Sequence, residues 1–355
     1  MQLSEIFDSQ AVAMNREEVE SNKIPFVGEA FFPNRKKMGI DLKWIKTHKG
    51  LGIALKPSNF DALSTIRTRP GIAMTKEEMP LFRESMQVRE HDMIEVMRIQ
   101  EANDPYADAV LQDIYDDTNN LIDGADIAVE RMRMQLLSGN NGMPGITIGT
   151  ADNMIHYYNY DEDGSWKAKH YIELTGNDTW DNPSTSKPLN DISKVTKYLK
   201  SIGVTPSFML STSATFDYLV ESEQIKNSLI TLTGTPINFM DTDTAEDVFR
   251  RKTKLDLITY DKMFIDYDGK EKNFYPDDYV TIIGSGQLGN TWYGTTPEER
   301  TLISDPKVDV TVLERGVAIA VKTEYGPPVQ VSTTASQIVL PSFEGMDSIC
   351  VIKVK

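Results

Sequence analysis

Hydrophobic residues recur at three- and four-residue steps between residues 104 and 138, which is the spacing of one face of a helix. They are Ala107, Leu111, Ile114, Leu121, Ala125, Val129, Met132 and Leu136. Asp104 is a suitable N-cap, Pro105 fits the first helical position, and Gly139 follows where a left-handed C-terminal cap belongs. The pattern predicts one helix over about residues 104–138, about 50 Å long at 1.5 Å per residue.

Two segments before this helix have different patterns. Residues 1–33 are polar and weakly helical and end in Phe31-Phe32-Pro33, so we expect an arm that lies on another surface. Between Ile40 and Arg69, apolar and polar residues alternate, which predicts a long twisted hairpin. Its strands carry few apolar residues, so the hairpin would be marginal alone and should also lie on another surface.

Helices and strands are mixed without regular alternation after Gly139. Asp161–Gly164 separates two alternating segments, 153–160 and 166–174, and predicts a hairpin. Residues 177–188 are the candidate domain boundary. We expect helices at 191–201 and 214–222, strands at 208–210, 255–259, 263–267 and 279–283, and a mostly β tail from 308 to 355. This order favours an α+β fold over a doubly wound sheet.

Composition narrows the class of protein. The chain has 355 residues, 40% hydrophobic and 25% charged, as in ordinary globular proteins, and its length suggests roughly two domains. The one cysteine, Cys350, can form no intrachain disulfide and leaves no thiolate cluster for a metal. The N-terminus lacks a signal-peptide pattern, and no run of about 18 apolar residues occurs. We expect a protein of a reducing cytoplasm that neither is exported nor spans a membrane.

Charge is segregated along the chain. Residues 34–90 hold twelve basic and six acidic side chains, whereas residues 91–130 hold eleven acidic side chains and one basic one. One interpretation is complementary surfaces on neighbouring copies in an assembly; the other is two solvated faces of one monomer. On the first interpretation, the candidate contact residues are Lys43, Lys46, Lys49, Arg67 and Arg69 against Asp108, Asp113, Asp116 and Asp117. The net charge of −16 argues against tight, sequence-reading contact with DNA.

Recognisable catalytic machinery is absent from the sequence. The four histidines lie far apart, and no nucleophile elbow, P-loop or dinucleotide-binding motif occurs. The segment from Asp266 to Glu271 has glycine at position 4 of the loop and lysine at position 5, so it fails as a calcium loop and predicts a hairpin turn at Gly269. We therefore predict no catalytic, metal or cofactor-binding residues and no cofactor. Dispersed carboxylates such as Asp266 and Asp277 leave a hydrolase as one alternative.

The order of elements resembles the major capsid proteins of tailed bacteriophages. A helical arm, a basic alternating segment, a long acidic helix, a mixed α/β part and a returning β tail are arranged as in the lambda-type head proteins, the capsid protein E family. The more specific similarities are Phe31-Phe32-Pro33 before the strand at 40–46, the run 67–71, the segment 269–284, and residues 323–328 with 341–343.

This resemblance implies the Hong Kong 97-like capsid fold. It places an N-terminal arm at 1–35, an extended loop at 36–90, a peripheral domain at 91–184 and 306–355, and an axial domain at 185–305. The helix at about 104–138 would be the spine of the peripheral domain. Because the extended loop of that fold lies on a neighbouring copy, the resemblance favours the assembly interpretation of the charge pattern.

The resemblance also implies a function and partners. The chain would be a major head protein that self-assembles as pentamers and hexamers into an icosahedral shell around double-stranded DNA. It would assemble in the host cytoplasm and reside in the virion. A separate scaffolding protein is expected because the arm begins at once, and a portal and a decoration protein are further candidate partners. A decoration or tail protein of the same virion is the nearer alternative function.

Overall fold

The computed structural model describes residues 25–45, 74–88, 91, 94, 106–149, 155–227, 242–266, 269–301, 308–313, 316–324 and 330–355. The chain divides into two compact units. The first comprises residues 1–42, 76–132 and 290–342, and the second comprises 43–75, 133–289 and 343–355. The expected arm, loop, peripheral and axial domains are defined by their places in an assembled shell, so their boundaries stay a prediction.

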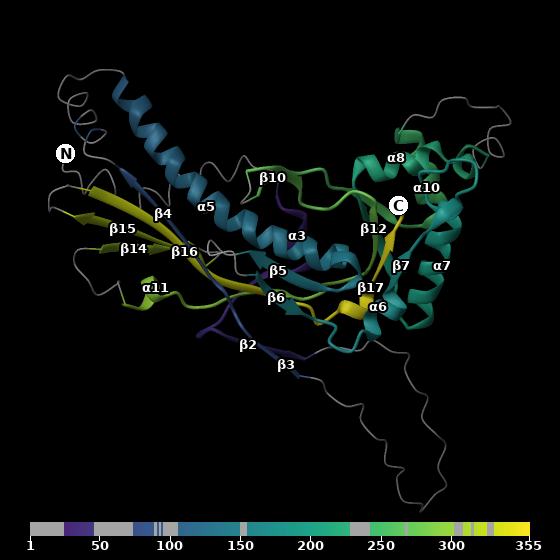
Figure 1. Cartoon of the computed structure of the whole chain (residues 1–355), viewed down its shortest axis with the longest axis horizontal. Coiled ribbons are helices and arrows are strands. Elements are labelled where there is room, and N and C mark those ends of the chain that lie inside the picture. Colours follow the sequence, from purple (N-terminus) through teal and green to yellow (C-terminus); the bar gives the residue numbers. More distant parts are fainter. Residues whose placement is uncertain are drawn as a thin grey trace, which may run out of the picture. The chain divides into compact units, whose positions relative to one another are not determined.

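The first unit is built on a mixed sheet around one long strand. Its strands are β1 (Asn34–Lys36), β4 (Leu81–Val88), β13 (Asn290–Tyr293), β14 (Val308–Val312), β15 (Ala318–Glu324) and β16 (Gln330–Ser342). Strand β16 pairs antiparallel with β15 and β4 (Figure 1). It also pairs antiparallel with β13, and β1 runs parallel to β13. Its helices are α3 (Val27–Phe31), α11 (Pro297–Thr301) and the part of α5 (Tyr106–Ser138) up to Met132.

Helices α5 and α11 pack on opposite faces of this sheet. Gln337 donates a side-chain hydrogen bond to the Ala125 carbonyl of α5 over 2.8 Å. The preceding residue, Ser336, donates to Oε2 of Glu298 in α11 over 2.9 Å. Consecutive residues of a strand point to opposite faces, so the sheet is the middle layer of the unit.

The predicted extended hairpin is described only at its base. Strand β2 (Asp41–Ile45) pairs with β3 (Met74–Glu78) in a two-stranded sheet. Residues 46–73, which would form the rest of the hairpin, lie outside the described residues.

The second unit contains a five-stranded sheet in the order β7-β17-β12-β8-β9. The strands are β7 (Tyr171–Glu173), β8 (Pro206–Ser211), β9 (Asp256–Thr259), β12 (Tyr279–Gly284) and β17 (Ile349–Lys353). Strand β12 runs antiparallel to both neighbours, whereas β17 is parallel to β7 and β8 is parallel to β9. The C-terminal strand thus lies inside a sheet whose other strands come from residues 171–284.

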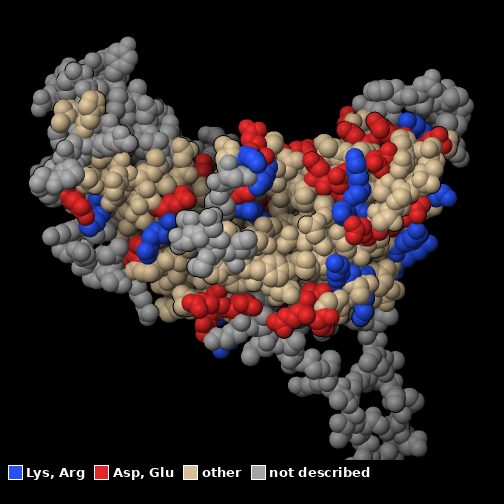
Figure 2. All heavy atoms as spheres, in the orientation of Figure 1, with Lys and Arg blue, Asp and Glu red and all other residues tan. Residues whose placement is uncertain are grey.

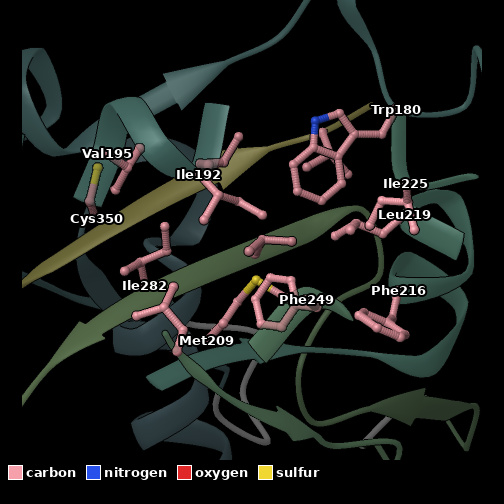
Figure 3. Close-up of a cluster of buried hydrophobic side chains, with 14 of the residues drawn as sticks. Trp180, Ile192, Val195, Met209, Phe216, Leu219, Ile225, Phe249, Ile282 and Cys350 are labelled. Atoms are coloured by element: carbon pink, nitrogen blue, oxygen red, sulfur yellow. The ribbon is translucent and has the colours of Figure 1, made fainter. Parts of the chain in front are cut away.

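Three helices cover one face of this sheet: α7 (Pro188–Ser201), α8 (Ser213–Glu221) and α10 (Thr242–Thr253). Their apolar side chains meet those of the strands in a core in which Trp180, Phe249 and Ile282 are fully buried (Figure 3). Alternate strand residues face the other way, and Thr281 there donates to the carbonyl of Leu137, near the end of α5, over 2.7 Å. The central strand β12 is therefore buried on both faces.

The predicted long helix is confirmed. Helix α5 has 33 residues and ends before Gly139, which adopts φ 67°, ψ 13°. A left-handed conformation is accessible to glycine without strain. A Cβ at Gly139 would also lie 3.2 Å from the Trp166 ring, so space as well as backbone conformation favours glycine here.

The hairpin predicted over 153–174 is wrong. Strand β6 (Ile155–Asn159) pairs with β5 (Gly145–Gly149), and the turn at 161–164 leads into helix α6 (Ser165–His170). The Asp161 carboxylate accepts hydrogen bonds from the N–H groups of Trp166 and Lys167, both over 3.0 Å. The carboxylate thus satisfies two of the backbone amides that lack a partner at the start of a helix. Trp166 and His170, four residues apart, lie on the same face of α6, and both are buried.

The other strands and helices predicted between residues 191 and 283 are confirmed to within a few residues at their ends. A hairpin joins β10 (Met263–Ile265) to β11 (Glu271–Asn273), with Gly269 at φ 73° as the turn predicts. Helix α10 was not predicted from the sequence. Among the helices described, none is both long enough and apolar enough to cross a membrane.

Candidate assembly surface

The predicted contact residues are only partly described. Lys43 lies on β2 with its side chain exposed, whereas Lys46, Lys49, Arg67 and Arg69 lie outside the described residues. The backbones of Asp108, Asp113, Asp116 and Asp117 lie in α5, but their side chains are not described. The predicted charge contact between copies therefore stays a prediction. Figure 2 shows acidic and basic side chains of the described residues on one face of the molecule, where both kinds occur.

The C-terminal end of the predicted arm is attached to the rest of the first unit by a buried carboxylate. The backbone N–H of Gly28, in helix α3, donates to Oε1 of Glu130 over 2.8 Å, and the Glu130 side chain is fully buried. Phe31 and Phe32 are buried as well, at 5% and 0% exposure. The carbonyl of Phe32 accepts a hydrogen bond from the Thr291 hydroxyl over 2.9 Å. Polar and apolar contacts together hold this end of the arm.

Two consecutive carboxylates of α11 connect three strands of the same unit. Glu298 binds Arg83 of β4 over 2.5 Å and accepts a hydrogen bond from Ser336 of β16. Glu299 binds Lys36 of β1 over 2.7 Å. Because Glu298 is 5% exposed, its bond to Arg83 is only weakly screened by solvent. These contacts hold the base of the extended loop to the sheet.

The sequence alone predicted neither Glu130 nor the two glutamates of α11, Glu298 and Glu299, as contact residues. Glu130 lies away from the predicted apolar stripe of the spine helix, so nothing in the sequence indicated its burial or its partner 102 residues away. The signal for α11 was available, since Pro297 followed by two glutamates is typical of a helix start. Its partners on β4 and β16 could not be read from the sequence.

A buried histidine lies between elements of the second unit. Nδ1 of His170 lies 2.8 Å from the carbonyl oxygen of Ile349, so Nδ1 carries the proton and donates it. Nε2 then accepts from the Tyr198 hydroxyl over 3.3 Å, and the ring stacks on Trp166. Burial lowers the pKa of His170, and this effect outweighs the opposing influence of the Ile349 carbonyl and Asp347. The group is therefore structural.

The carboxylates considered for hydrolysis are engaged elsewhere. Asp266 binds Lys272 across the β10–β11 hairpin, and Asp277 accepts a hydrogen bond from Asn273 over 3.2 Å. Among the described residues, no three His, Cys, Asp or Glu side chains are grouped as metal ligands. Cys350 is fully buried, and burial raises the pKa of its thiol to about 12, so it is a core residue rather than a nucleophile.

The sequence matches the model of a known family over most of its length. The family is described as phage major capsid protein E, and the match spans residues 11–313. The chain belongs to this family. No curated protein matches the sequence.

Several solved structures share the fold of this capsid protein. The putative capsid protein of a prophage of E. coli CFT073 is similar with a TM-score of 0.59 and 14% identity, covering 98% of this chain and 99% of that one. A phage-related protein of Bordetella bronchiseptica RB50 has a TM-score of 0.56 and 12% identity, covering 98% and 97%. The cyanophage A-1(L) capsid subunit has a TM-score of 0.52 and 14% identity, covering 93% and 92%.

The predicted family, fold class and function are thereby confirmed. The chain is a major capsid protein with the Hong Kong 97-like α+β fold and forms the oligomeric shell of a phage particle. The family comprises major capsid proteins, which are structural. The match therefore does not favour either alternative function, a hydrolase or a decoration or tail protein.

Proposed function

We propose that copies of this capsid protein form pentamers and hexamers that close into an icosahedral shell. The shell assembles in the host cytoplasm around a separate scaffolding protein and is filled with double-stranded DNA through a portal. The observation that carries this proposal is the family match over residues 11–313. Weak contacts suffice for such a shell because each copy makes several of them at once.

The domain assignment belongs to the same proposal. The arm (1–35) and extended loop (36–90) reach neighbouring copies, the peripheral domain (91–184 and 306–355) carries the spine helix, and the axial domain (185–305) meets its counterparts at the symmetry axes. The fastening of Gly28 to Glu130 supports a fixed origin for the arm. The ties from α11 to β1 and β4 likewise support a fixed base for the loop.

Contact with DNA is proposed to be independent of sequence. A net charge of −16 repels the phosphate backbone, so DNA is retained by enclosure rather than by tight binding. A decoration protein on the outer surface is a further proposed partner.

Electron microscopy tests the proposal directly. The chain is expressed alone, with the product of the gene just upstream as the expected scaffold, and with an unrelated acidic protein as control. We expect closed shells of uniform size only with the scaffold. A protein that remained a 40.0 kDa monomer in all three preparations would contradict the proposal.

A further inference from the structure

The predicted extended loop begins and ends on two short stretches of the first unit. Residues 36–42 lead into the loop and residues 79–83 lead out of it, and we call these two stretches the loop base. The N–H of Met79 donates to the carbonyl of Ile40 over 2.9 Å, and Leu42 and Met79 are buried at 1% and 4% exposure. The two stretches are therefore joined to each other, and their contacts with the rest of the unit determine how freely the loop can turn.

The end of strand β13 packs closely against the loop base. The carbonyl of Tyr293 accepts a hydrogen bond from the Lys37 N–H over 2.8 Å. At the next residue, Gly294, an added Cβ would come within 2.8 Å of the Gly39 carbonyl oxygen, so glycine permits the approach. The N–H of Gly294 donates to the carbonyl of Ile338 in β16 over 2.8 Å. The loop base thus rests on a segment that is itself hydrogen-bonded to the sheet.

Two adjacent carboxylates of α11 bind the loop base on both sides of the loop. Glu299 binds Lys36, which precedes the loop, over 2.7 Å, and Glu298 binds Arg83, which follows it, over 2.5 Å. The second oxygen of Glu298 accepts a hydrogen bond from Ser336 of β16 over 2.9 Å. A carboxylate with both oxygens engaged by donors is held in one position. We call Glu298 and Glu299 the carboxylate clip.

The two halves of the carboxylate clip differ in exposure. The side chain of Glu298 is 6% exposed, whereas those of Lys36 and Glu299 are 40% and 20% exposed. Solvent and salt weaken the more exposed ion pair more strongly. We therefore expect Glu298 to contribute more than Glu299 to the order of the loop base.

We propose that the carboxylate clip fixes the direction of the extended loop in the single subunit, before a neighbouring copy binds. Glu298 and Glu299 are thus positioning residues for assembly. A loop that already points in its bound direction loses little conformational entropy on contact, so the contact is tighter. The contrasting arrangement is a loop that turns freely and takes its direction only from the neighbour. The role in assembly rests on the proposed function, whereas the direction of the loop is measured without it.

Distances between two spin labels measure this direction in the unassembled subunit. Lys43→Cys on β2 and Ser85→Cys on β4 place the labels at exposed positions, and the buried Cys350 stays unlabelled. We expect one narrow distance distribution in this background and one about twice as wide when Glu298→Gln and Glu299→Gln are added. Glu298→Gln alone should cause the larger part of the change. A distribution that is already wide in the background, or that the two substitutions leave unchanged, would overturn the proposal.

Glu324→Gln is the matched control for the loss of an ion pair. Glu324 binds Lys322 over 2.5 Å in the same sheet but not at the loop base. Its removal should leave the distance distribution at the background width. Equal widening in this control would assign the effect to lost charge in general and contradict a role for the clip.

A reversed ion pair separates position from stability. Glu299→Lys should widen the distribution, and Lys36→Glu in the same chain should narrow it again, because the reversed pair restores the contact. All variants are measured well below their melting temperatures, so that a loss of stability alone does not change the distribution. A distribution that stays wide in the reversed pair would refute the positioning role of Glu299.

The yield of shells tests the role of the clip in assembly. With the scaffold present, Glu298→Gln with Glu299→Gln should lower the yield about tenfold, because the loop must then be ordered on contact. Glu324→Gln should build shells at the wild-type yield. Normal shells from the clip variant would overturn its role in assembly. If the wild type builds no shells, the proposed function fails, and the spin-label distances still decide whether the clip fixes the loop.

Discussion

His170 illustrates how single residues stabilise the second unit. Its two ring nitrogens are satisfied by the Ile349 carbonyl and the Tyr198 hydroxyl, and its ring lies parallel to Trp166. The sequence showed only that no metal-ligand spacing surrounded this histidine, which favoured a structural role. Its partners come from β17 and α7, 179 and 28 residues away, so only the folded chain could identify them.

Because the pKa of His170 is lowered, we predict that the free energy of unfolding decreases in acid. Above its ordinary value of 6.5, the histidine is neutral in both folded and unfolded chains, and its full contribution to stability is present. As the pH falls below that value, the unfolded state takes up the proton first, so the free energy of unfolding decreases. We expect the free energy of unfolding in urea to fall more steeply for the unassembled wild type than for His170→Gln as the pH is lowered from about 6.5 to 5.5.

The control for this prediction is the exposed His156 in the same unit. His156→Gln should keep the wild-type pH dependence, whereas His170→Gln should also lose about 1–3 kcal/mol at neutral pH from its buried hydrogen bonds. Identical pH slopes in the three proteins would assign the acid sensitivity to other groups.

Among the elements, a helix with a strong local pattern was predictable, whereas a short helix that depends on one side-chain hydrogen-bond acceptor was not. Helix α5 was predictable from its apolar spacing and its caps, and the structure confirms the helix and the left-handed Gly139 at its C-terminus, whereas Asp104 and Pro105 lie outside the described residues. Helix α6 was mistaken for a strand because residues 166–174 alternate, and the Asp161 carboxylate decided the matter by accepting two helix amides. A turn with aspartate and glycine is compatible with either outcome.

The attachment of helix α3 to helix α5 through Glu130 can be tested by substitution. Glu130→Ala should leave the buried Gly28 N–H without its acceptor, lower stability by about 1–3 kcal/mol and speed amide exchange over Val27–Phe31. Glu130→Gln keeps an oxygen that can accept the bond, so a smaller effect is expected. Hydrogen–deuterium exchange followed by mass spectrometry measures this difference. Exchange over Val27–Phe31 that stays at the wild-type rate in Glu130→Ala would mean that the apolar contacts of Phe31 and Phe32 hold the helix.

At the scale of the whole molecule, the segregated charge predicts a contact between the basic segment of one copy and the acidic segment of another. The structure of a single copy does not test this contact. Replacing Lys43, Lys46 and Lys49 by glutamate should lower the yield of shells about tenfold while the subunit stays folded. Lys194, Lys197 and Lys200 on the exposed face of α7 provide a control with the same three reversals. Light scattering during assembly and electron microscopy of the products measure the yield.

A compensating exchange sharpens this prediction. Asp108, Asp113, Asp116 and Asp117 replaced by lysine should restore shells in the variant with three glutamates, and added salt should reduce the difference between variant and wild type. Loss of shells in the α7 control, or normal shells in the loop variant, would contradict the charge contact.

The sequence by itself determined the spine helix, most strands of the second unit, the lack of recognisable catalytic motifs and the resemblance to a capsid family. These follow from local periodicity, caps and turn residues, whose signals lie within a few positions of one another. Only the tertiary structure decided that β17 enters the second sheet between β7 and β12, that Glu130 holds Gly28, and that Glu298 joins β4 to β16. Such contacts join residues far apart in the chain, and they form only when burial brings the two partners to the same place.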